Sequence, residues 1–341
     1  MKAAGRWTRP FPLLLVIAPL LAGCSGWQSA LDAQGAPAQG LRLLIVVIMS
    51  VCAVVWLIVI AILLWALFRR RDMRASLPVV DPARERRMAI VVVAGIAVTV
   101  AVITAFTVAS FLTTRSLAVA SDNDLTIHVR GFQWWWEVEY PGGEGGASFK
   151  TANEIHIPVG RNVRIELEGM DVVHSFWVPS LAGKQDLIPG RSNALTIRAE
   201  RAGLYRGQCA EFCGLQHAHM ALLVVAQEAA DFEGWRGSQL APAAPAPDDP
   251  EAARGRQVFL SGACAACHTV RGTSASGATG PDLTHIGSRQ YIAAGLLPTT
   301  RGSLAAWIAD PQTLKPGNNM PAVALAPEEL RAVSAYMASL K

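Results

Sequence analysis

Two cysteine motifs in the sequence combine residue types and spacings that suit metal chemistry. The first occupies residues 209–220 and reads Cys-Ala-Glu-Phe-Cys-Gly-Leu-Gln-His-Ala-His-Met. It offers two thiolates, an imidazole and a thioether from one loop, and such soft ligands suit copper rather than Mg²⁺ or Ca²⁺. A further imidazole must come from elsewhere, and His174 ends a strand-like run 35 residues before Cys209. We therefore expect a thiolate copper site, and one such loop could bridge two metal ions.

The second motif, Cys-Ala-Ala-Cys-His at residues 264–268, has the C-x-x-C-H spacing that attaches haem c. In this pattern Cys264 and Cys267 form thioethers to the haem, and His268 lies under the iron. A redox dithiol is the alternative for the same cysteine spacing. We expect a covalent haem c.

The other axial ligand of the iron should lie far downstream of His268. Met320 stands in a rigid Pro-Gly-Asn-Asn-Met-Pro loop, and a thioether there raises the reduction potential. His285 and Met337 are alternatives. However, His285 follows the motif closely and Met337 lies inside the last helical pattern, so Met320 is the predicted ligand.

The composition favours a membrane portion. The 341 residues are 52% hydrophobic with a mean hydropathy of +0.31, and residues 43–68 and 88–112 are free of charge and long enough to cross a bilayer. The loop between them is rich in arginine, so it should be cytoplasmic and both ends of a hairpin over 41–114 should face outward. Cys52, inside the first span, is expected to be a packed thiol. The mild net charge of +4, spread along the chain, gives no support for nucleic-acid binding.

The residues after the spans predict two further domains. Alternating runs bounded by Gly, Pro and Asn predict an all-β domain over 121–228. Residues 238–250 are rich in Pro and Ala and form a linker. Helical patterns follow in the region 251–341. The expected fold class is a two-helix transmembrane hairpin, an all-β sandwich and a small all-α domain.

The N-terminal residues have the charged-then-apolar pattern of a signal peptide. Lys2, Arg6 and Arg9 precede an apolar stretch over 11–22, which is too short to span a membrane as a mature helix. The following Leu-Ala-Gly-Cys resembles a bacterial lipobox, which implies cleavage after residue 23 and a lipid anchor at Cys24. An ordinary signal followed by a chance cysteine is the alternative.

Residues 41–226 resemble subunit II of cytochrome c oxidase, whose dinuclear CuA centre uses Cys-x-Glu-x-Cys-x-x-x-His-x-x-Met and an upstream His. The resemblance implies a cupredoxin-like fold. It also implies a set of CuA ligands, with Glu211 acting through its backbone carbonyl: His174, Cys209, Glu211, Cys213, His217 and Met220. The Glu211 carboxylate would contact Mg²⁺ at the border with subunit I. His128, His156 and His219 fall outside the ligand positions and are expected to be structural or exposed.

The aromatic run over 131–140 is similar to the segment of that family whose first tryptophan receives electrons from cytochrome c, which implies this role for Trp134. If the run is a strand, Trp134 and Trp136 share one face and Trp135 the other; simple core packing is the alternative reading. The family's Trp at the start of the second span is missing from Arg-Glu-Arg-Arg-Met at 84–88, so we assign Glu85 no proton role.

The region 251–341 resembles a class I bacterial cytochrome c, with Gly-Pro-Asp-Leu at 280–283 matching the family's Gly-Pro-x-Leu loop. The fusion resembles the haem-c-containing cytochrome c oxidases of bacteria. It implies electron transfer from haem c through CuA to subunit I, where oxygen is reduced to water and protons are translocated. Subunits I and III and a cytochrome c or similar donor are the implied partners. The implied location is the bacterial inner membrane, with both soluble domains on the periplasmic face.

The linker between the two soluble domains and the opposite net charges of these domains both favour docking. Thirteen residues of extended chain reach about 40 Å, and the tether gives an effective concentration on the order of mM. Residues 121–226 hold 12 acidic and 9 basic side chains, whereas 251–341 hold 5 and 8. The opposite net charges favour encounter.

Other functions fit the motifs less well. A CuA subunit of a nitric oxide reductase-type enzyme is the main alternative. Quinol oxidase subunits lack the copper ligands that are present here, and a lipoprotein that stores or delivers copper would need no haem. The hairpin counts against a soluble nitrous oxide reductase.

Overall fold

The computed structural model describes residues 25–69, 81–117, 125–142, 146–243 and 249–341. The expected signal peptide, Cys24 and much of the arginine-rich loop lie outside these ranges. The described chain divides into two compact units, with residues 39–119 separate from the rest.

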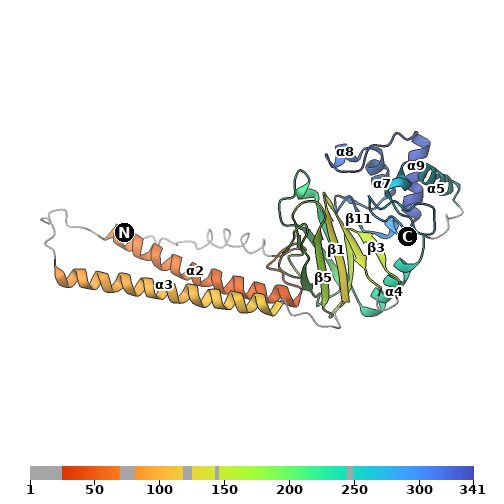
Figure 1. Ribbon diagram of the computed structural model, residues 1–341. Coiled ribbons are helices and arrows are strands. Elements are labelled where there is room, and N and C mark those ends of the chain that lie inside the picture. The colour runs from red at the N-terminus through yellow and green to blue at the C-terminus, as the bar shows by residue number, and fades with distance from the viewer. Residues whose placement is uncertain (1–24, 70–80, 118–124, 143–145, 244–248) are drawn as a thin grey trace, which may run out of the picture. The chain divides into compact units, whose positions relative to one another are not determined.

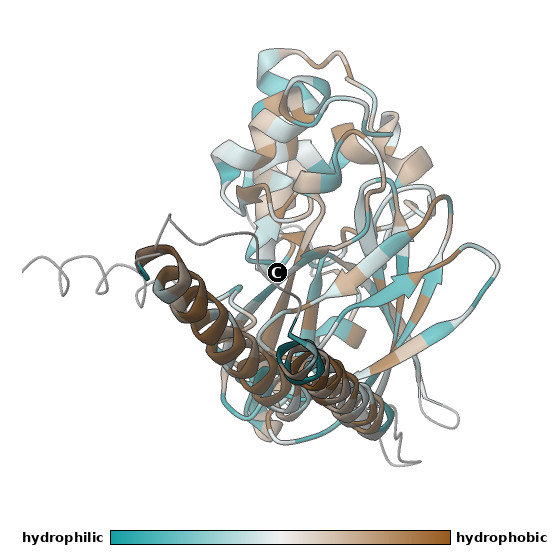
Figure 2. Cartoon of the chain, turned by 90° about the vertical axis from the view of Figure 1, so that its left-hand side faces the viewer, coloured by the Kyte–Doolittle hydropathy of each residue, from teal (hydrophilic) through white to brown (hydrophobic). Residues whose placement is uncertain are grey.

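The smaller unit contains two long helices, α2 (Ala36–Phe68) and α3 (Pro82–Leu117). Both contain a stretch apolar and long enough to cross a membrane, and most of their length is coloured hydrophobic in Figure 2. They extend beyond the charge-free stretches expected from the sequence. Helix α3 begins at Pro82, where the Asp81 carboxylate accepts a hydrogen bond from the backbone N–H of Ala83 (2.9 Å), as an N-cap residue does.

The β domain is a sandwich of two five-stranded sheets (Figure 1). One sheet has the order β3-β2-β1-β5-β8 and the other β4-β10-β9-β6-β7. The strands are β1 (Leu125–Phe132), β2 (Trp135–Tyr140), β3 (Phe149–Ala152), β4 (Glu154–Pro158), β5 (Val163–Gly169), β6 (His174–Trp177), β7 (Gln185–Leu187), β8 (Asn193–Ile197), β9 (Gly203–Cys209) and β10 (Ala221–Gln227). Alternate residues of β1 and β5 are buried between the sheets, as the period-2 pattern predicts.

Strand pairing brings the two halves of the copper motif together. β6 begins at His174 and pairs with the end of β9, with Phe176 opposite Cys209. The residues between β9 and β10 form the motif loop, which includes a short 3₁₀ helix, η1 (His217–His219). The register of β6 against β9 therefore places His174 beside the loop.

The aromatic run is not a continuous strand. Phe132 of β1 pairs with Trp135 of β2, so Gln133 and Trp134 are the two turn residues of a hairpin. Strand alternation does not continue through a turn, so it does not decide which face Trp134 shares; Trp134 and Trp136 nevertheless belong to the same buried cluster, whereas Trp135 is only partly buried. Trp136 is fully buried in the sandwich core.

Part of the expected linker is helical. Helix α4 (Ala229–Leu240) packs Phe232 and Trp235 against the β domain, and the Trp235 ring stacks on His156 with centroids 3.9 Å apart. Residues 238–240, expected in the linker, are its last turn. The large apolar residues that pack this helix on the core are Phe232, Trp235 and Leu240, and the last of them lies within the Pro/Ala-rich segment, which explains why the sequence pattern was weak.

The C-terminal domain is small and mostly helical. Its elements are α5 (Pro250–Ser261), α6 (Cys264–Cys267), η2 (Ile286–Ser288), β11 (Tyr291–Ile292), β12 (Leu297–Pro298), α7 (Arg301–Ala309), α8 (Pro311–Leu314) and α9 (Pro327–Ser339). Helices α5 and α9 lie side by side (Figure 1), with Phe259 against Tyr336. The β domain and this domain belong to one compact unit. The order of elements along the chain agrees with the predicted fold class.

Candidate copper and haem centres

Two buried thiols and an imidazole converge at the start of the motif loop. The Sγ atoms of Cys209 and Cys213 are 3.7 Å apart, and Nδ1 of His174 is 3.9 Å from Cys209 Sγ. The backbone carbonyl oxygen of Glu211 lies 3.2 Å from the same sulfur. These groups come from β6, β9 and the motif loop, as the sequence predicts.

The rest of the motif surrounds the second thiol. Nδ1 of His217 is 3.6 Å from Cys213 Sγ, and Sδ of Met220 is 3.9 Å from it. Met220 is fully buried. The structure thus brings every sequence-predicted copper ligand into one cluster.

The cluster fits a soft metal ion. Metal–thiolate bonds are about 2.3 Å long, so two sulfurs at the observed separation can bind the same ion. The hydrogen bond between the two sulfurs lowers the pKa of Cys209 to about 4, against the effect of burial. The same hydrogen bond raises the pKa of Cys213. One thiolate is therefore present at neutral pH before any metal binds.

His174 is oriented by a neighbouring carboxylate. Its Nε2 lies 2.8 Å from Oδ1 of Asp171, and the backbone N–H of Gln133 donates to the other oxygen of Asp171 (2.6 Å). Burial lowers the pKa of His174, but the contacts with Cys209 and Asp171 outweigh it and raise the pKa above its usual value. A carboxylate on the far ring nitrogen is a common way to aim a histidine ligand.

Other predicted positions have contacts of their own. The Glu211 carboxylate, expected to contact Mg²⁺, forms an exposed ion pair with Lys184 (3.3 Å), and the Mg²⁺ site stays a prediction. His128 pairs with Glu166. His219 contacts Gln216.

Trp134 contacts the copper loop directly. Its indole Nε1–H donates to the carbonyl oxygen of Cys213 (2.9 Å), and the side-chain amide of Gln133 donates to the same oxygen (2.7 Å). Gly214 has a φ of +110°, and a Cβ there would lie 3.1 Å from the indole. The ring is therefore packed tightly against the loop that carries the thiols.

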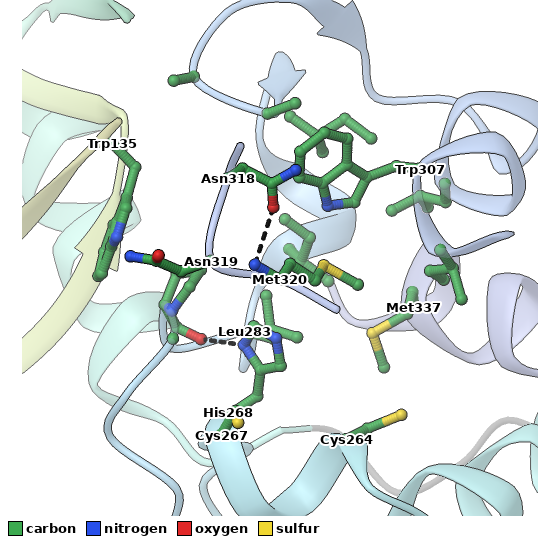
Figure 3. Close-up of a pocket in the computed structure, with 18 of the residues that line it drawn as sticks. Trp135, Cys264, Cys267, His268, Leu283, Trp307, Asn318, Asn319, Met320 and Met337 are labelled. Carbon is green, nitrogen blue, oxygen red and sulfur yellow. Dashed lines mark hydrogen bonds between the residues drawn. The ribbon is translucent and has the colours of Figure 1, made fainter. Parts of the chain in front are cut away.

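The C-x-x-C-H motif lines a large cavity in the C-terminal domain (Figure 3). Cys264, Cys267 and His268 lie at its base. Nδ1 of His268 is hydrogen bonded to the carbonyl oxygen of Pro281 (2.9 Å), which leaves Nε2 free for a metal. Burial lowers the pKa of His268, so the imidazole is neutral, as a metal ligand must be.

Two methionines share this cavity. Met320 and Met337 both line it, and Figure 3 shows both side chains at the cavity. His285 is not among the lining residues, because its ring nitrogens contact the carbonyl oxygens of Lys341 and Ala241 (both 3.1 Å). The geometry therefore leaves two thioethers as candidates for the second axial position.

In comparisons with known proteins, two parts of the chain match two different families. Residues 143–227 match the family model "Cytochrome C oxidase subunit II, periplasmic domain", and residues 252–341 match the cytochrome c family. The chain joins a cytochrome c oxidase subunit II domain to a cytochrome c domain.

Individual relatives are named cytochrome c oxidase subunit 2. This chain is 42% identical over 221 residues to cytochrome c oxidase subunit 2 of Alkalihalophilus pseudofirmus, covering 64% of this chain and 62% of the relative. The protein of that name from Bacillus subtilis is 32% identical over 232 residues, covering 65% and 64%. The crystal structure of the periplasmic domain of subunit II of cytochrome oxidase from Bradyrhizobium japonicum is 32% identical, covers 36% of this chain and all of that one, and has a TM-score of 0.33. The chain thus spans just under two thirds of the length of the first two relatives.

The cytochrome c cavity is completed by the subunit II domain. Its lining includes Gln133, Trp134, Trp135 and Asn153, and Figure 3 shows Trp135 near Asn319 of the cytochrome domain. The ring of Trp135 stacks on Phe132 with centroids 4.9 Å apart. The turn of the β1–β2 hairpin therefore lies between the copper ligands and the haem cavity.

Arg289 is a functional candidate that sequence reasoning missed. It lines the cavity, is 7% exposed, and its Nε is buried without a hydrogen-bond partner among the described residues. Nη2 of Arg289 donates to the carbonyl oxygen of Asp282, which leaves Nε as the buried donor that needs an acceptor. A haem carboxylate would supply one, so the residues present fit a haem. The only signal in the sequence was a single charged residue in the stretch 283–300.

Proposed function

We propose that the chain is the electron-accepting subunit of a haem-c-containing cytochrome c oxidase. It takes electrons at haem c and passes them through CuA to subunit I, where oxygen is reduced to water with proton translocation. The observation that supports this most strongly is the convergence of two thiols, two imidazoles and a thioether on one site, with a single hairpin turn separating it from the C-x-x-C-H cavity.

Both cofactors would supply one-electron chemistry, copper through bridging thiolates and iron through a haem ring. The copper ligands we propose are His174, Cys209, the Glu211 carbonyl, Cys213, His217 and Met220. Because both ends of their loop continue into paired strands, the protein holds the ligands rigidly. We therefore expect the ligands to move little when the copper site gains or loses an electron.

In the cytochrome domain, Cys264 and Cys267 would hold the haem covalently and His268 would bind the iron. The hydrogen bond from His268 to Pro281 keeps the imidazole in one orientation. Met320 is the proposed second axial ligand, because it stands in a loop where its N–H donates to the Asn318 side chain and its carbonyl oxygen accepts from Gln312. Met337 is held in helix α9.

Trp134 would carry electrons between the centres. It lines the haem cavity and donates a hydrogen bond to the backbone of a copper ligand. Gln133 makes the same two contacts through its amide, but Trp134 is the one of the pair with an aromatic ring, which suits electron transfer. Its 8% exposure means that, with the cytochrome domain in this position, a diffusible donor would reduce the haem rather than reach Trp134.

The proposed setting is the bacterial inner membrane. The hairpin of α2 and α3 would anchor the chain beside subunit I, with subunit III as a further partner, and Cys24 would add a lipid anchor. Both soluble domains would lie on the periplasmic face. Without subunit I, the chain should oxidise a reduced donor but not turn over oxygen.

The test is the metal content and optical spectrum of the full chain, purified in detergent after haem attachment and copper loading. We expect two coppers and one haem per chain, with thiolate-to-copper absorption that disappears in Cys209→Ser. Cys52→Ser, which changes a cysteine of α2, is the matched control and should leave both centres intact. One copper or none in the wild-type chain, with haem present, would refute the CuA assignment.

A further inference from the structure

A buried lysine joins the cytochrome domain to the subunit II domain. Lys315 follows helix α8 and is only 2% exposed, although lysine is among the residues least often buried. Its Nζ donates to three backbone carbonyl oxygens, those of Trp134 (2.7 Å), His219 (2.8 Å) and Ala293 (3.2 Å). Two of these acceptors belong to the subunit II domain.

Both acceptors in the subunit II domain lie next to the electron path. Trp134 bonds to the carbonyl of Cys213 through its indole. His219 lies in η1, between the proposed ligands His217 and Met220. Lys315 therefore contacts the hairpin turn and the copper loop at the same time, without touching a proposed ligand.

On the other side, Lys315 begins the loop that carries Met320. The side-chain amide of Asn318 donates to the Lys315 carbonyl (2.8 Å), and its oxygen accepts from the Met320 N–H (2.8 Å). Gln312 donates to the carbonyl oxygen of Met320 (2.8 Å) and accepts from the Gly317 N–H (3.0 Å). These bonds make the loop a stiff connection between the lysine and the haem cavity.

The loop and the subunit II domain are in close contact. A Cβ at Gly317 would lie 3.3 Å from Leu215 and 3.6 Å from the Trp134 ring. Gln216 donates to the carbonyl oxygen of Pro316 (2.8 Å). The domains thus meet in a defined arrangement at this point.

A second contact fixes the orientation elsewhere. The buried carboxylate of Glu154, on β4, accepts a hydrogen bond from the backbone N–H of Gln290 (2.7 Å). Two polar contacts at different places on the interface restrain rotation of one domain on the other, which a single contact would not.

We propose that Lys315 is a positioning residue that holds the cytochrome domain against the Trp134 turn, so that electrons pass from haem to copper within a preformed complex. This rests on the proposed function of the two centres. Without the lysine, the linker would still keep the domains near each other, but each transfer would wait for a diffusional encounter. Wild-type transfer should therefore be independent of solvent viscosity.

The test uses the full chain in detergent, loaded with haem and copper. A photoexcited ruthenium complex reduces the haem in a laser flash, and reoxidation of the haem by copper is followed optically in buffer and in added sucrose. The variants are Lys315→Met, which keeps an unbranched side chain one atom shorter and removes the Nζ donor, and Lys341→Met, which removes an exposed lysine of the same domain. Haem content, copper content and both reduction potentials are measured on each.

We expect Lys315→Met to slow transfer by about tenfold or more, because a single hydrogen bond shifts an equilibrium by roughly twofold to tenfold and the two that cross the interface are both lost. The remaining rate should fall as viscosity rises. Lys341→Met should match the wild type. Both centres should keep their contents and potentials, which a general loss of structure would not allow.

Transfer in Lys315→Met that is as fast as in the wild type and independent of viscosity would overturn the proposal. If that variant fails to load both centres, Lys315→Gln takes its place, since its shorter side chain cannot reach all three carbonyls; the same two outcomes then decide. Absence of copper or haem from the wild-type chain would instead refute the proposed function.

Discussion

Replacing Trp134 with phenylalanine would remove one hydrogen bond from the copper loop while keeping an aromatic ring in the hairpin turn. The lost bond is the one from Nε1–H to the carbonyl oxygen of Cys213. That oxygen keeps the hydrogen bond from Gln133, so no buried acceptor is left without a partner. The substitution therefore tests the bond itself.

The expected loss of stability is about 2 kcal/mol. One hydrogen bond contributes about 0.5–1.5 kcal/mol net when its acceptor stays satisfied. The smaller ring buries roughly 40–50 Å² less apolar surface, which corresponds to about 1 kcal/mol. In a unit of this size the melting temperature should fall by about 4–8 °C.

Thermal unfolding of the full chain, followed by calorimetry in detergent, measures this loss. Trp135→Phe is the matched control, because Trp135 is partly exposed and stacks on Phe132; it should cost less than about 1 kcal/mol. The same samples should show slower haem-to-copper transfer in Trp134→Phe alone, with two coppers retained. Equal melting temperatures for Trp134→Phe and wild type, or equal losses in the two variants, would refute the reasoning.

Three further predictions concern the haem, the buried lysine and the copper loop. Met320→Ala should change the haem spectrum by removing a thioether from the iron, whereas Met337→Ala should mainly lower the melting temperature; the reverse pattern would assign the ligand to Met337. Burial lowers the pKa of Lys315 from 10.5 to about 7. The unfolded chain therefore binds more protons above pH 7, and this residue's contribution to stability rises with pH and is lost as pH falls through about 7. The difference in unfolding free energy between the wild type and Lys315→Met should grow by about 2 kcal/mol from pH 7 to 9, and denaturant titrations that show no growth would contradict this. Gly214→Ala should destabilise by about 1–3 kcal/mol, because a positive φ and a close indole oppose a side chain, while Gly237→Ala, in α4 with open space around it, should stabilise by about 0.5–1 kcal/mol; thermal unfolding of both variants checks the two signs.

Local patterns in the sequence were sufficient to predict the metal and haem ligands and to predict which elements are helices and which are strands. Residues 209–220 carry their ligands at short spacings, and C-x-x-C-H at 264–268 depends on five adjacent residues. The two membrane-length helices and the β alternation are likewise properties of neighbouring residues, because burial repeats with the period of the element. Helix α4 was missed because the few large side chains that mark its packed face run into the Pro/Ala-rich segment.

Contacts between distant residues were decided only by the tertiary structure. The register of β6 on β9 places His174 beside Cys209, and the hairpin turn aims Trp134 at Cys213 rather than along a strand face. The burial of Lys315 depends on how the cytochrome domain packs on the Trp134 turn, 181 positions away. Such pairings follow from the shape and polarity of whole surfaces, which no local period in the sequence records.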